Sequence, residues 1–169
     1  SGVILSQILR GLATTLKDKT EATGHSVAEA LTAASAGAYQ AVLKPIEGTI
    51  LTVAREAAEA AKTTSAEGAT LADVIRAARD AGRRALDSTP DLLPVLKDAG
   101  VVDAGGAGYL LLLDSALHVV DGEPLPPADD ADGPTAAQLA EVAHRTSDTD
   151  GELDVSEQRY EVMYFLDLA

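Results

Sequence analysis

Apolar residues recur at steps of three and four positions in successive segments of this chain, and no other feature constrains the fold as strongly. Within the first segment these residues are Ile4, Leu5, Ile8, Leu9, Leu12 and Leu16. Such spacing places one apolar face along about four turns of helix. The same kind of pattern continues through residues 26–43, 49–63, 70–86, 89–100 and 109–120. The sequence therefore predicts six helices with short connections, which favours an all-α antiparallel bundle or barrel.

Polar residues mark where several of these helices should begin. Ser26 with Glu29 matches the capping-box pattern, in which each side chain binds the other's backbone amide. Thr49 and Thr70 precede apolar runs and are predicted N-caps. Thr89, which a proline follows, is predicted to cap a shorter helix with that proline at its first position.

Composition supports helices and excludes several functions. Hydrophobic residues make up 46% of the chain but aromatic residues only 3%, which suits helices packed through small side chains better than a β-sandwich. Cysteine is absent, so disulfides and thiolate metal sites are excluded. A net charge of −14 disfavours binding to nucleic acid or anionic membranes. No apolar run reaches the roughly 20 residues of a membrane span.

The composition changes after residue 122. Residues 123–134 contain four prolines and four acidic residues, which predicts an acidic linker over residues 123–158, where residues 135–144 could form a short helix. Residues 159–169 combine alternation with β-forming residues and predict one strand. Because a lone strand is unstable, it is expected to join a sheet outside the helical domain of residues 1–122.

Three predicted helix starts lie beside glycines: Ser1-Gly2, Gly48-Thr49 and the segment from Asp103 to Gly108, which includes Gly105. The first N–H groups of a helix lack intrahelical partners and carry partial positive charge. Because alternate helices of an antiparallel barrel begin at the same end, the three starts could meet at one anion site. Two alternatives stay open. The Gly48 turn could be only a helix start, and residues 103–108 could be only a tight connection.

Other chemically active residues show no catalytic or metal-binding pattern. The three histidines occupy different elements and are expected to be structural or surface residues: His25, His118 and His144. Three aspartates lack the rest of a calcium loop and fit the linker better: Asp129, Asp130 and Asp132. Three serines have no base nearby in sequence: Ser1, Ser6 and Ser35. The sequence thus predicts no catalytic side chain and no metal ligand.

Three segments together resemble a known family. They are residues 1–11 (SGVILSQILRG), 44–56 (KPIEGTILTVARE) and 92–108 (LLPVLKDAGVVDAGGAG). They are similar to the nucleotide-binding domain of the dihydroxyacetone kinase family, L-subunit type. The similarity is greatest to the branch that contains the kinase subunit of bacterial two-component fatty acid kinases, and it covers about residues 1–120.

The resemblance implies a cytoplasmic eight-helix barrel that binds ATP and magnesium at one end. It also implies γ-phosphate transfer to an acceptor on a partner protein, either a fatty acid carboxylate on a lipid-binding protein or a dihydroxyacetone-like hydroxyl. By position, the nucleotide-binding residues would be Ser1, Gly2, Gly48, Thr49, Asp103 and Gly105. In phosphoryl transfer such backbone donors position groups and offset charge.

The chain also departs from the family. The family's aspartate-rich magnesium loop and two of its helices would precede Ser1, so we expect an N-terminally truncated, incomplete barrel without kinase activity of its own. Residues 159–166 resemble the first strand of the following middle domain, with Val162 and Met163 where related proteins often carry cysteine. The alternative is a non-catalytic helical scaffold. In either case exposed helix faces or the strand could support a homo-oligomer.

Overall fold

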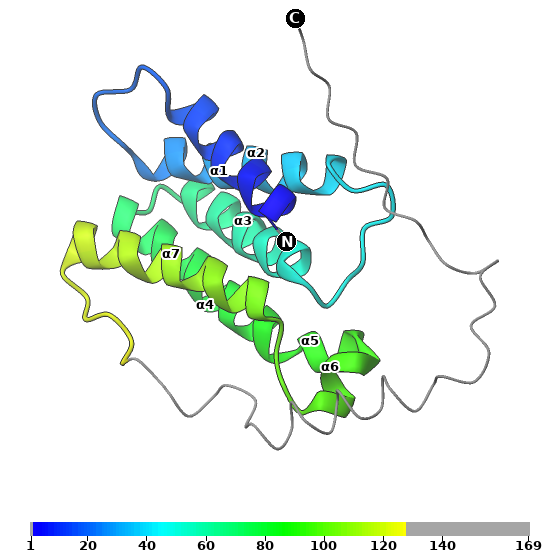
Figure 1. Ribbon diagram of the computed structural model, residues 1–169. Helices are drawn as coiled ribbons and strands as arrows, with labels where there is room; N and C mark the ends of the chain where they lie inside the picture. Colours follow the sequence, from blue (N-terminus) through cyan, green and yellow to red (C-terminus); the bar gives the residue numbers. More distant parts are fainter. Residues whose placement is uncertain (1, 128–169) are drawn as a thin grey trace, which may run out of the picture. The chain divides into compact units, whose positions relative to one another are not determined.

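The computed structural model describes residues 2–127, and helices are its only regular elements in that range. The helices, in chain order, are α1 (Gly2–Leu16), α2 (Gly24–Gln40), α3 (Ile50–Ala66), α4 (Leu71–Asp87), α5 (Thr89–Leu92), α6 (Pro94–Ala99) and α7 (Ala104–Asp121) (Figure 1). The predicted all-α class is confirmed for this range. The predicted strand and the short helix of residues 135–144 lie outside the described residues.

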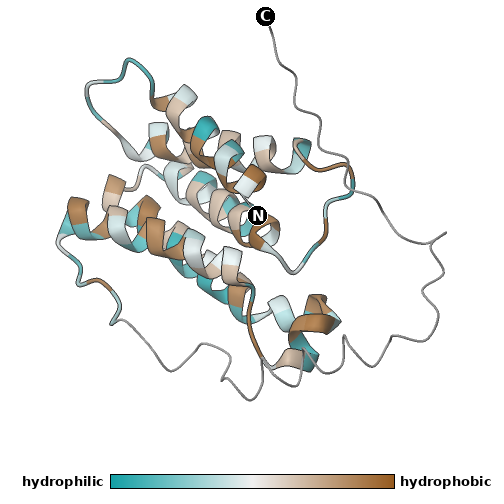
Figure 2. Cartoon of the chain, in the orientation of Figure 1, coloured by the Kyte–Doolittle hydropathy of each residue, from teal (hydrophilic) through white to brown (hydrophobic). Residues whose placement is uncertain are grey.

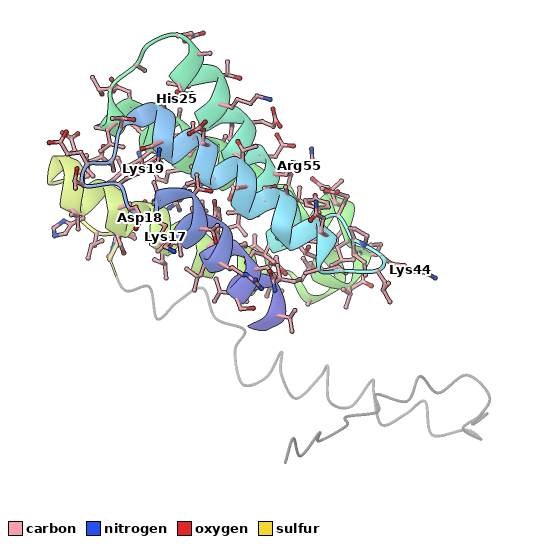
Figure 3. The ribbon with its side chains drawn as sticks, turned by 90° about the horizontal axis from the view of Figure 1, so that it is seen from above. Lys17, Asp18, Lys19, His25, Lys44 and Arg55 are labelled. Carbon is pink, nitrogen blue, oxygen red and sulfur yellow. The ribbon has the colours of Figure 1, made fainter. Side chains whose placement is uncertain are left out.

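The long helices pack in an antiparallel order. Gly11 of α1 lies against Ala34 of α2, and Gly37 of α2 lies near Gln7 of α1, so these two helices run in opposite directions. Helix α4 packs against both α3 and α7, and α3 also contacts α2 and α7. Figures 1 and 3 show that α1, α3 and α7 begin at the same end of this helical unit. The predicted shared end therefore exists.

Helix α3 forms the centre of the core. Its buried residues include Leu51, Val53, Ala57 and Ala61, and the last three of these are 0% exposed. Small side chains let neighbouring helices approach closely, as where Gly82 of α4 faces α3 and α7. Alanine thus serves here as a packing residue, as the composition predicts.

One predicted helix start is wrong by three residues. Helix α2 is capped by Thr23, whose hydroxyl accepts from the N–H of Ser26 at 3.1 Å. Ser26 is the third residue of the helix, and its own hydroxyl accepts from the N–H of Thr23 at 2.8 Å. The earlier start buries Gly24, where an added Cβ would meet Val74 at 3.0 Å. Packing against α4 therefore decides between two residues that can both cap a helix.

The region between α4 and α7 also differs from expectation. The single helix predicted for residues 89–100 is divided at Leu93 into α5 and α6, because Pro94 disfavours helical angles at the residue before it. Thr89 is not the predicted cap but the first residue of α5, and it is fully buried. Helix α7 starts at Ala104, five residues before the predicted start. Asp103 caps this earlier start, so the glycines at positions 105, 106 and 108 belong to the helix.

The other predicted caps are confirmed. Thr49 accepts from the N–H of Leu51 at 3.3 Å, and Thr70 accepts from the N–H of Asp73 at 3.2 Å. Helix α3 continues to Ala66, slightly beyond its predicted end near residue 63. Local sequence is therefore sufficient to place these two starts.

Ion pairs join α4 to the end of α7. Arg76 Nε donates to Glu123 at 2.7 Å, and Arg79 Nη1 donates to the other carboxylate oxygen at 2.9 Å. These bonds hold the pKa of Glu123 below its ordinary value, with the Arg76 hydrogen bond as the main cause. Arg83 pairs with Asp114 at 3.3 Å farther along the same helices. The residues just after α7 are thereby tied to the helical unit.

Several apolar side chains remain exposed on the outer helices. Val3, Leu5 and Leu9 lie exposed on α1, and Leu111 and Val119 lie exposed on α7. Figure 2 shows further apolar residues along α7 and in the turn between α2 and α3. None of the helices in residues 2–127 combines the length and the apolar character needed to cross a membrane.

Candidate functional site

Two of the predicted glycine turns meet at the shared end of the helices. An added Cβ at Gly105 would lie 3.3 Å from the Cβ of Ile50, the first residue of α3. At Gly106 it would lie 2.8 Å from Val53 of the same helix. The start of α7 therefore rests directly on the first turn of α3, at a distance that larger side chains would prevent.

The turn before α3 has a left-handed backbone conformation that glycine adopts without strain. Gly48 has a φ of 81°, in the left-handed region. It is buried against α5, where an added Cβ would meet Leu92, Leu93 and the carbonyl oxygen of Thr89, each at 3.0 Å. The Thr49 hydroxyl donates to the carbonyl oxygen of Ile46 at 2.8 Å. Both residues thus shape the turn.

A polar network holds this turn from the side of α2 and α3. Thr52 accepts from the N–H of Gly48 at 2.8 Å and donates to Glu47 Oε2 at 2.6 Å. Arg55 donates to the same oxygen at 3.1 Å, and the Tyr39 hydroxyl donates to Glu47 Oε1 at 2.9 Å. These hydrogen bonds, Thr52 first, hold the pKa of Glu47 below its ordinary value.

The second turn is fixed through Thr89. Its hydroxyl donates to the carbonyl oxygen of Leu86 at 2.7 Å and accepts from the N–H of Asp103 at 3.1 Å. Asp103 in turn caps α7, its Oδ2 accepting from the N–H of Gly106 at 2.7 Å. Since Thr89 O also lies beside Gly48, one buried residue connects the two turns.

The meeting point presents backbone donors. Within residues 2–127, the N–H groups of Thr49 and Ile50 on one turn, and of Ala104 and Gly105 on the other, have no protein acceptor. Two helix N-termini with unpaired N–H groups and partial positive charge favour an anion. The Gly48 N–H is not among these donors because Thr52 accepts from it.

Four of the six predicted site residues are brought together: Gly48, Thr49, Asp103 and Gly105. Gly2 starts α1 at the same end, and an added Cβ there would meet nothing within 4 Å. Ser1 lies outside the described residues. The loop with Lys17, Asp18 and Lys19 lies at the opposite end from Lys44 (Figure 3), so it does not contribute to this site.

Two surface pockets flank α3, and one adjoins the turns. A pocket of about 300 Å³ between α3 and α4 is lined by Thr52, Arg55, Arg84 and Leu92, among others. A larger, apolar pocket of about 480 Å³ between α2 and α3 has His25 on its wall. Figure 3 places His25 toward the end that carries the Lys17 loop. The smaller pocket is therefore the one next to the Gly48 turn.

The comparison with known protein families gives a match over most of the chain. The family model described as DAK2 domain matches residues 1–118.

The chain belongs to the DAK2 domain family.

The match covers nearly the same residues as the resemblance to the L-subunit type of dihydroxyacetone kinase and confirms it at that level.

Relatives of this DAK2 domain are longer proteins. Protein YloV of Bacillus subtilis is 43% identical over 126 residues, which is 75% of this chain and 23% of that protein. An uncharacterized protein of Staphylococcus epidermidis is 43% identical over 123 residues, 73% of this chain and 22% of that protein. Uncharacterized protein SH1689 of Staphylococcus haemolyticus is 34% identical over 160 residues, 95% of this chain and 28% of that protein. The chain thus spans about a quarter of the length of these relatives.

The described part of the DAK2 domain does not fit a magnesium site by itself. Among residues 2–127, no group of three or more His, Cys, Asp or Glu side chains is arranged to hold a metal. Of the histidines, His25 pairs with Glu29 on the surface and His118 contacts the carbonyl oxygen of Glu123. His144 lies outside the described residues.

Sequence reasoning missed the side chains that hold the turns: Tyr39, Glu47, Thr52, Arg55 and Thr89. Glu47 and Thr52 lie on either side of the predicted Gly48-Thr49 turn, and this closeness in sequence was the only indication that they could support it. Tyr39 gave no signal and Thr89 was predicted only as a helix cap, because both reach the turns from other helices.

Proposed function

We propose that this DAK2 domain contributes to the ATP site of a kinase that phosphorylates a small acceptor held by a partner protein. The acceptor would be a fatty acid carboxylate or a dihydroxyacetone-like hydroxyl. The observation that supports this proposal is the meeting of the two glycine turns, Gly48-Thr49 and Asp103-Gly105, at one end of the helices. Family membership supports the kinase class.

In this proposal the chain's own groups bind and orient the phosphates. The N–H groups of Thr49 and Ile50 would face one side of the triphosphate, and those of Ala104 and Gly105 the other. ATP supplies the phosphoryl group when bound. Fixed backbone donors offset developing negative charge and need no rearrangement during the transfer.

We further propose that the chain does not transfer phosphate alone. Its described residues offer no magnesium site, and phosphoryl transfer depends on a cation to neutralise the phosphate charge. The ligands would come from outside these residues. Magnesium-dependent ATP turnover by the isolated chain, with or without a lipid-binding partner, would contradict this statement.

Gly105 provides the direct test of the nucleotide site. An added Cβ would crowd Asp103 Oδ2 at 3.1 Å and Ile50 at 3.3 Å, so Gly105→Ala should distort the donors of α7. Gly108→Ala, on the same helix, is the matched control because an added Cβ there meets nothing within 4 Å. We expect Gly105→Ala to weaken binding of a fluorescent ATP analogue about tenfold and Gly108→Ala to leave it unchanged.

Equal binding by both variants would place the nucleotide elsewhere. An unmodified chain that does not bind the analogue would instead favour the alternative, a non-catalytic scaffold. One observation supports self-association in that case. The exposed residues Val3, Leu5 and Leu9 lie on α1, a helix without acidic residues in a chain of net charge −14, so two copies could meet there without carboxylate repulsion. Light scattering that shows a monomer at high concentration would refute it.

A further inference from the structure

We propose that Glu47 is a positioning residue, which sets the direction of the hydrogen bonds beneath the Gly48-Thr49 turn and so keeps the Thr49 and Ile50 N–H groups available to phosphate. The inference rests on the proposed function. It assigns a role to a carboxylate that touches neither the proposed phosphate nor α7.

The chemistry of a carboxylate fixes the orientation of Thr52. An ionised carboxylate only accepts hydrogen bonds, so the Thr52 hydroxyl must donate its proton to Glu47 Oε2, 2.6 Å away. The lone pairs of that hydroxyl are then free to accept from the Gly48 N–H at 2.8 Å. Thr52 is only 3% exposed, so water does not readily replace either partner. The Gly48 amide is thereby held away from the ligand.

The other contacts keep the carboxylate in place and neutralise it. Tyr39 occupies Oε1 at 2.9 Å, while Arg55 shares Oε2 at 3.1 Å. An unpaired carboxylate beside a phosphate site would repel the ligand. The Arg55 guanidinium offsets that charge, so Glu47 can serve as an anchor without a large electrostatic penalty.

A glutamine at position 47 would disturb this arrangement while keeping its size. One of its two terminal atoms is an NH₂ donor, but Thr52, Tyr39 and Arg55 all donate to the native carboxylate. At least one donor therefore loses its acceptor or must turn around. If the Thr52 hydroxyl rotates, its proton faces the Gly48 N–H. The Gly48 N–H then loses its hydrogen-bond acceptor.

Glu56 supplies a matched control. Its carboxylate also pairs with Arg55, at 2.8 Å, and its side chain is 45% exposed against 47% for Glu47. Glu47→Gln and Glu56→Gln thus remove the same charge from the same arginine, but only the first touches the turn. Thr52→Val and Thr52→Ser form a second pair, in which only serine retains the hydroxyl.

The experiment measures two quantities on the whole 169-residue chain. The first is amide hydrogen exchange at Gly48 without nucleotide. The second is the dissociation constant of a fluorescent ATP analogue. We expect Glu47→Gln and Thr52→Val to accelerate Gly48 exchange and to weaken binding, each about tenfold. Glu56→Gln and Thr52→Ser should change both by less than about twofold.

The two proposals fail in different ways. If Glu47→Gln matches Glu56→Gln in both measurements, the positioning role is refuted although the nucleotide site can stand. If the unmodified chain does not bind the analogue, the ATP site fails and the role assigned to Glu47 fails with it, even where the exchange data follow the expected order. The melting temperature of each variant tests whether lost binding reflects lost stability. If Glu47→Gln and Glu56→Gln melt at the same temperature and only Glu47→Gln binds the analogue weakly, the loss of binding comes from the turn and supports the positioning role.

Discussion

Replacing Gly11 with alanine tests how closely α1 packs on α2. The added Cβ would lie 2.6 Å from the Cα and 2.7 Å from the N of Ala34. Carbon atoms in contact prefer separations of about 3.5–4.0 Å. The helices would therefore have to separate by roughly 0.9 Å, because the opposing atoms belong to the backbone and cannot rotate away.

Two opposing effects set the expected magnitude. Alanine is favoured over glycine inside a helix by about 0.5–1 kcal/mol. Overpacking of a tight contact costs about 1–3 kcal/mol, and a contact with backbone belongs in the upper part of that range. We expect Gly11→Ala to lower the free energy of unfolding by about 1–2 kcal/mol. Gly108→Ala, with nothing within 4 Å of the added Cβ, should raise it by about 0.5–1 kcal/mol.

Urea denaturation followed by circular dichroism at 222 nm (about the helix minimum) measures both changes, and an unchanged slope would show that the midpoint shift reflects stability. The test is whether the free energy of unfolding falls in Gly11→Ala while it rises in Gly108→Ala. A Gly11→Ala protein that is at least as stable as the unmodified chain would mean that α1 and α2 are not in backbone contact, and the packing argument would be wrong.

Two further predictions concern hydrogen bonds that hold the helices and the turns. The pKa values of Glu47 and Glu123 are depressed below 4.5 by hydrogen bonds from Thr52 and Arg76, so their stabilising effect is complete above that pH and is lost as the pH falls through the folded values. Melting temperature should fall below about pH 4.5, less steeply in a Glu47→Gln/Glu123→Gln double variant; identical pH profiles would contradict this. Thr89→Val should lower the free energy of unfolding by about 1–3 kcal/mol because it removes one buried and one partly buried hydrogen bond, whereas Thr89→Ser should cost less. Equal urea midpoints for these two variants would refute the bridging role.

The long helices could be predicted because their signal is local. Residues three and four positions apart share a face whatever the rest of the chain does, and the caps Thr49 and Thr70 act on amides only two or three residues away. Pro94 is equally local, and its effect on Leu93 was available in the sequence. The start of α2 was not available, because Thr23 and Ser26 are both capable caps and contact with α4 chooses between them.

The same distinction between local and long-range signals applies to the candidate site. Glycine-bearing helix starts could be recognised one at a time, and antiparallel order predicted that alternate starts share an end. The support beneath them could not be recognised, because the partners of Glu47 lie 5 or 8 residues away from it, on α2 and α3. Thr89 lies 14 residues from the amide that it binds. Hydrogen bonds across such separations depend on packing that no local pattern encodes.

The glycines at the start of α7 show why sequence alone left two interpretations open there. Gly106 is a packing residue, because an added Cβ would meet Val53 at 2.8 Å and Leu86 at 3.0 Å. Gly108 faces open space. Gly105 lies between these extremes, crowded by Asp103 and Ile50 but half-exposed. The tight connection and the proposed anion cradle are therefore compatible explanations of one segment. Gly106 brings α7 onto α3, and that approach is what places the Gly105 N–H beside the first turn of α3.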